Sequence, residues 1–129
     1  MMEISKRCKI VLLINSVAAL IFMVFYLIIP KLYFNITDGP VFDPYYWRAF
    51  GVTLLVLGLF SLRAYLIGKK EQAKFMLEIG FIWPLIILIL NIWELIFLEL
   101  SLTYTVNTWL NNVILLVLGI MNIYTYYKE

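Results

Sequence analysis

The chain has 129 residues, of which 64% are hydrophobic and 14% are charged, whereas ordinary soluble domains are about 45–50% apolar and about 25% charged. Its formal net charge is +2, with no histidine and one cysteine, so the commonest general base and metal ligand are missing and an intrachain disulfide is excluded. These numbers favour a single integral membrane domain over 1–129, with no metal or cofactor and, for want of a basic patch with interleaved aromatics, no nucleic-acid partner.

The first apolar segment, about 10–29, follows a basic start that contains Lys6, Arg7 and Lys9. The uncharged run over 10–30 is longer than the roughly 7–15 residues of a signal-peptide core. Such a run is long enough to cross a hydrocarbon core about 30 Å thick as a helix. We therefore interpret the segment as a retained transmembrane helix.

The second helix is predicted over about 44–68. Asp43 directly precedes Pro44, a pair typical of a helix start, because the Asp side chain can cap the first turn and a proline there loses no needed N–H. Gly68 is a suitable helix end. The segment between the first two helices is expected to be a loop with a turn at 37–40.

The third helix is predicted over about 75–98, with a kink at Pro84. The fourth is predicted over about 107–126, with Thr105 or Asn107 as its cap. Together the segments predict an all-α membrane protein, a four-transmembrane-helix antiparallel bundle. Basic residues concentrate before the first helix, between the second and third, and after the fourth, so the positive-inside rule places both termini in the cytoplasm of a multi-pass cell-membrane protein.

Four charged residues lie within the second and third segments. The uncharged stretch between Arg48 and Arg63 covers about 21 Å of helix and that between Glu78 and Glu94 about 22 Å, both less than a core of about 30 Å. In an antiparallel hairpin, Arg48 is level with Glu94 and Arg63 with Glu78, which predicts two ion-pair layers. Rotation opposes the idea in part, because the two glutamates differ by about 160° around the helix. Snorkelling of Arg63 and an interfacial position for Glu78 near Lys74 are the alternatives.

Glu94 lies close to a polar face of its helix. Gly80, Pro84 and Asn91 share that face, and Glu94 is about 60° away from it. Faces of this kind point to the interior of a bundle. Glu94 and Asn91 are therefore candidates for a ligand site or an ion pair, with Arg48 as the expected partner of the carboxylate. No nucleophile–base pair accompanies them, so we predict no catalytic residue.

Asn35 begins the triplet Asn35-Ile36-Thr37, which matches the N-glycosylation acceptor pattern. It falls in the segment that the positive-inside rule places outside. The pattern is short and common, so a chance triplet beside a turn is the alternative.

The stretch DPYYWRAFGVTLLVLGLFSLRAYLIGKK, in which an arginine opens a glycine-containing second helix, resembles small DoxX-like four-helix membrane proteins. The resemblance covers the second and third helices. It implies a four-helix bundle in the plasma membrane that in some members acts as a subunit or partner of redox systems. It supplies no catalytic residue.

Three functions follow as hypotheses. The first is a non-enzymatic bundle in the lipid bilayer that binds a lipid-like ligand, a membrane protein partner or a second copy of itself. The second is a small transporter or exporter that uses Glu94 in the membrane. The third is an intramembrane enzyme acting on a lipid, with Glu94 as general acid or base.

Overall fold

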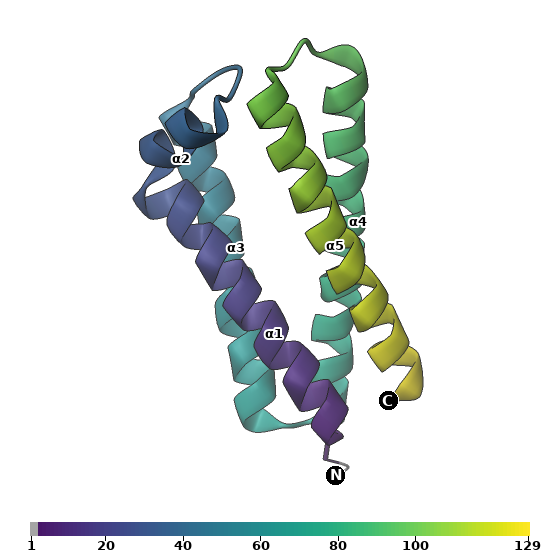
Figure 1. Cartoon of the computed structure of the whole chain (residues 1–129). Coiled ribbons are helices and arrows are strands. Elements are labelled where there is room, and N and C mark those ends of the chain that lie inside the picture. Colours follow the sequence, from purple (N-terminus) through teal and green to yellow (C-terminus); the bar gives the residue numbers. More distant parts are fainter. Residues whose placement is uncertain (1–2) are drawn as a thin grey trace.

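A computed structural model describes residues 3–129, and over this range the chain is all-helical (Figure 1). The helices follow one another as α1 (Lys6–Met23), the π-helical turn η1 (Val24–Ile28), α2 (Pro30–Thr37), α3 (Pro44–Ile67), α4 (Lys70–Phe97) and α5 (Leu102–Lys128). Four stretches are long and apolar enough to cross a membrane, as predicted: Lys6–Ile28, Pro44–Ile67, Lys70–Phe97 and Leu102–Lys128.

The limits of α3 agree with the sequence signals. The Asp43 side chain accepts a hydrogen bond from the Tyr45 N–H at 3.0 Å, and Pro44 is the first helical residue. Gly68 ends the helix with a φ of +70°, a left-handed conformation that glycine adopts without steric penalty. The predicted start and end of this helix are therefore confirmed.

The other long helices begin earlier than predicted. α1 begins at Lys6 and α5 at Leu102, capped by Ser5 and Ser101, whose side chains accept hydrogen bonds from the backbone at 3.1 and 3.2 Å. The prediction of Thr105 or Asn107 as a cap is thus wrong, because an apolar run marks only the apolar part of a helix and misses its more polar first turn. α4 begins at Lys70 and continues through the buried Pro84 to Phe97.

The segment after the first long helix is not only a loop. In η1 the Ile29 N–H donates to the Val24 carbonyl at 3.0 Å, a wide turn with one residue more than an α-turn. α2 follows, with Pro30 at its start and Asp38 at its end in a left-handed conformation (φ of +53°). Of the loop and turn predicted for this segment, only the turn after Thr37 is present.

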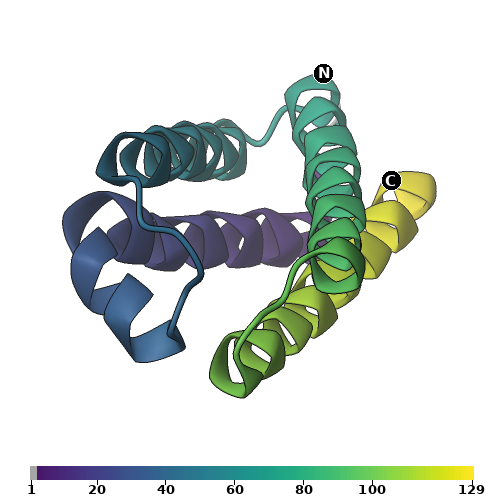
Figure 2. The same ribbon diagram turned by 90° about the horizontal axis from the view of Figure 1, so that it is seen from above.

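The long helices pack as two pairs, α1 with α3 and α4 with α5, with few contacts between the pairs. At the α1–α3 contact, Ser16 donates to the Gly58 carbonyl at 2.9 Å, and a Cβ on Gly58 would collide with Leu20. Small residues at such contacts let helices approach closely. Figures 1 and 2 show the two pairs close together at one end and spread apart at the other.

We call the end that holds both chain termini and the α3–α4 turn the terminal end, and the end with α2 and the α4–α5 connection the loop end (Figure 1). At the terminal end the Glu129 carboxylate accepts hydrogen bonds from the Ser5 N–H and hydroxyl at 2.7 and 2.6 Å. The Ile4 N–H donates to the Gly68 carbonyl at 3.3 Å. A packed core joins the two pairs there: Ile4, Cys8, Val11, Leu12, Ala64, Ala73, Met76 and Leu77.

Candidate functional site

A cavity of about 460 Å³ lies between the two helix pairs. Residues from all four long helices line it, and η1 and α2 contribute Tyr26, Tyr33 and Thr37. Its volume lies within the range of roughly 300–1,000 Å³ typical of small-molecule sites, which are mostly apolar with a few polar groups. The cavity exists because the pairs diverge away from the packed core.

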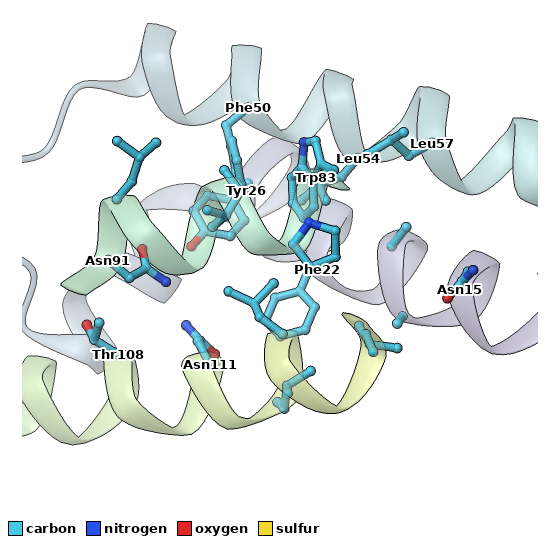
Figure 3. Close-up of a pocket in the computed structure, with 18 of the residues that line it drawn as sticks. Asn15, Phe22, Tyr26, Phe50, Leu54, Leu57, Trp83, Asn91, Thr108 and Asn111 are labelled. Atoms are coloured by element: carbon cyan, nitrogen blue, oxygen red, sulfur yellow. The ribbon is translucent and has the colours of Figure 1, made fainter. Parts of the chain in front are cut away.

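The walls of the cavity are largely aromatic and aliphatic. In Figure 3 the side chains of Phe22, Tyr26 and Trp83 gather in the middle of the space, below Phe50 and Leu54 of α3. These positions recur every three or four residues along each helix, so each helix turns one continuous face to the cavity. Such walls suit the apolar body of a ligand.

Tyr26 connects several rings of the lining. Its ring centroid is 4.8 Å from that of Phe50 and 5.1 Å from that of Trp47, and Phe50 in turn stacks on Trp83 at 5.8 Å. Ring pairs at these separations attract one another through their quadrupoles. The stack therefore joins α3 to α4 across the cavity, where the two helices otherwise touch little.

Glu94 is half-buried on α4 and lines the cavity near the loop end. Its carboxylate lies beside the Tyr104 hydroxyl of α5, and Tyr26 lies near both. Asn107 donates to the Tyr33 hydroxyl at 3.3 Å, and the Asn91 side chain donates to the side-chain Oδ1 of Asn112 at 2.9 Å. This end of the cavity thus combines one carboxylate with phenol and amide groups, which can hold the polar head of a ligand.

A second polar group lies on the other side of the aromatic stack (Figure 3). Asn15 of α1 and Asn122 of α5 exchange two hydrogen bonds at 2.6 and 2.9 Å, and Asn122 also donates to the Leu118 carbonyl at 2.7 Å. A Cβ on Gly80 of α4 would overlap the Asn122 amide. Three helices therefore meet here, and the amides hold the helices together between the core and the cavity.

The predicted ion-pair layers are not formed. Within residues 3–129, no ion pair joins Arg48 to Glu94 or Arg63 to Glu78. Both arginines are exposed and neither lines the cavity. Glu78 is half-buried and lies beside the Tyr126 hydroxyl of α5.

The physical reason is the choice of packing partners. Matching Arg48 with Glu94 by depth assumes that consecutive helices pack against each other, but α3 packs on α1 and α4 on α5. Each glutamate therefore has a tyrosine of α5 as its neighbour. Asn35 is exposed on α2, on a helix and not in a loop.

The sequence reading missed the aromatic lining. A usable signal was present, since Phe22 and Tyr26 are four residues apart and Trp47, Phe50 and Leu54 are three and four apart. That spacing predicts one face of a helix, although it does not say that two such faces meet.

Comparison of the chain with protein-family models, with curated proteins and with solved structures gives no match.

Proposed function

We propose that this chain is a multi-pass membrane protein that binds a small lipid-like amphiphile in the cavity between its two helix pairs. The observation that carries the proposal is the cavity itself, about 460 Å³ in volume, with an aromatic and aliphatic body and a half-buried carboxylate at one end. A soluble metabolite would leave such walls poorly solvated, whereas an amphiphile from the bilayer matches both parts.

The topology belongs to the same proposal. The four long helices cross the cell membrane as an antiparallel bundle, with the terminal end in the cytoplasm. Lysine and arginine distribution supports this orientation: the terminal end carries Lys6, Arg7, Lys9, Lys69, Lys70, Lys74 and Lys128. Likeness to DoxX-like proteins remains a prediction from the sequence, as does glycosylation of Asn35.

Binding can be measured through the tryptophans. Trp47 and Trp83 line the cavity, whereas Trp93 and Trp109 are 55% and 53% exposed. In a Trp93→Phe, Trp109→Phe chain purified in a non-ionic detergent, fluorescence reports mainly on the cavity. A brominated long-chain alcohol, whose bromine quenches nearby indoles, is expected to quench this fluorescence saturably.

Filling the cavity provides the matched test. Ala18 lines the cavity, and its neighbour Val17 is 49% exposed on the same helix. Ala18→Phe should weaken binding of the alcohol at least about fivefold, because extra side-chain atoms occupy the ligand's space. Val17→Phe should leave binding unchanged. Quenching that never saturates, or that is equal in the two variants, would contradict a ligand site in the cavity.

Transport is the second candidate function, favoured by the position of Glu94 on the wall of the cavity. Carboxylates at membrane depth frequently mark proton or substrate pathways. Proton-coupled flux of an amphiphile in vesicles containing the protein, lost in Glu94→Gln, would support transport over simple binding.

A further inference from the structure

We infer that the ligand of this cavity is a cationic amphiphile, with an ammonium group held between the Glu94 carboxylate and the surrounding aromatic rings. The inference rests on the proposed ligand-binding function and names the charge of the ligand's head. It arises because the cavity lining contains an acidic residue and several aromatic rings but no basic residue.

The cavity has a negative charge with no positive one. Glu94 is the acidic residue of its lining, and within residues 3–129 no lysine or arginine lines it. No ion pair to Glu94 occurs in the same range. The neighbouring Tyr104 hydroxyl can donate a hydrogen bond but brings no charge. An ionised carboxylate in apolar surroundings is unfavourable unless a cation or several donors compensate it.

The rings near Glu94 offer the second half of a cation site. Tyr26 lines the same cavity as Glu94 and packs at 5.1 Å on Trp47 and at 4.8 Å on Phe50. The faces of tryptophan, tyrosine and phenylalanine attract ammonium groups, and cages of such rings bind quaternary ammonium ligands. A half-buried carboxylate that shares a cavity with several rings is thus suited to a cation that has an apolar tail.

The terminal end supplies an internal comparison. There Lys74 lies 4.7 Å from the ring centroid of Tyr126, and Arg7 and Lys128 lie 5.4 and 5.9 Å from that of Tyr124. In the part of the chain that the structure describes, these are the cation–π contacts, and they all lie at the terminal end. Over residues 3–129, the aromatic rings around the cavity receive no cation from the protein itself.

The test compares amphiphiles that share one tail and differ in the head. In the Trp93→Phe, Trp109→Phe chain, dodecylamine, dodecyltrimethylammonium and dodecanol compete with the brominated alcohol for the cavity. We expect both cations to displace it at concentrations roughly 10- to 100-fold lower than dodecanol, the range expected for a charge-assisted contact. Dodecanoate should be the weakest competitor. Dodecylamine has N–H groups that can donate hydrogen bonds, whereas dodecyltrimethylammonium has none. Comparing the two therefore shows whether the head is held by hydrogen bonds or by charge and aromatic rings alone.

Variants of the two neighbouring glutamates isolate the carboxylate. Glu94→Gln keeps the shape of the side chain and should make the cations and dodecanol equally effective, while binding of the brominated alcohol persists. Glu94→Asp should retain part of the preference. Glu99, exposed and outside the cavity, gives the control variant Glu99→Gln, which should keep the full preference. Because all variants are measured in the same micelles, partition of the amphiphiles cancels in the comparison.

The outcomes separate this inference from the proposed function. If the brominated alcohol binds saturably but the cations gain nothing over dodecanol, the cationic ligand is ruled out and the lipid-binding function stands. If the cations keep their gain in Glu94→Gln, the Glu94 carboxylate does not hold the ammonium group and the inference fails as stated, again with the lipid-binding function intact. If no amphiphile binds saturably, the proposed function fails and the inference fails with it.

Discussion

The two ends of the molecule use the space between the helix pairs differently. At the terminal end, side chains from α1, α3 and α4 fill that space, and Leu12 and Leu77 have no exposed surface. Toward the loop end the same pairs diverge (Figure 1), and a cavity takes the place of a core. The comparison teaches that the two pairs pack closely over only part of their length, which leaves room for a cavity in the remainder.

The largest expected effect is at the packed end. Leu77→Ala should lower the free energy of unfolding by about 2–4 kcal/mol, because it leaves a void among side chains that cannot close it. Leu54, also buried but on the wall of the cavity, should lose less when changed to alanine. The measurement is unfolding of the purified protein in mixed micelles with increasing denaturing detergent. Equal losses at both sites would remove the distinction between the two ends.

An intermediate effect is expected where the core meets the cavity. Gly80→Ala should lower the free energy of unfolding by about 1–3 kcal/mol, because the new methyl group overlaps the Asn122 amide and disturbs its pairing with Asn15. Gly119→Ala on α5 is the matched control, since a Cβ there meets nothing within 4 Å. The control should be neutral or slightly stabilising. The same detergent-unfolding measurement applies, and a neutral Gly80→Ala would show that the three helices do not depend on this contact.

The smallest effect is expected at the loop end. Asn91→Leu removes the hydrogen bond of 2.9 Å to Asn112, and such bonds between membrane helices contribute on average about 0.6 kcal/mol and at most about 1.7 kcal/mol. Asn122→Leu removes its bonds to both Asn15 and Leu118 and should lower stability more. Thermal unfolding of the two variants measures this difference. A larger loss of stability in Asn91→Leu than in Asn122→Leu would contradict the expected contrast between the ends.

Much of the fold follows from the sequence. Runs of apolar residues determine where four long helices lie, and Asp43, Pro44 and Gly68 set the limits of α3. The polar face of α4 was correctly predicted to point inward, since Gly80, Pro84, Asn91 and Glu94 all line the cavity. α2 was missed because it is short and lies where a proline and a following turn suggest a loop.

The pairing of helices and the cavity could not be predicted in this way. Depth along a helix gives the level of Arg48 and Glu94 but not which helix each faces. Matching the two residues by depth requires that α3 packs on α4, whereas α3 packs chiefly on α1 and α4 chiefly on α5. The cavity depends on the divergence of two pairs and on rings from several helices, such as Tyr26, Trp83 and Tyr104. No periodicity within one helix contains that information.

The wide turn η1 makes the geometry of the loop end sensitive to the number of residues in this segment. A π-turn corresponds to one residue inserted into an α-helix, and at Val24–Ile28 it is followed by the non-helical Ile29, after which α2 begins at Pro30. Tyr26 lies within the turn and Leu27 lies against Gly51 of α3. Deleting a single residue there is therefore expected to change which side chains of this turn face α3 and the cavity. The geometry of the loop end therefore depends on residue count in this segment as well as on residue type.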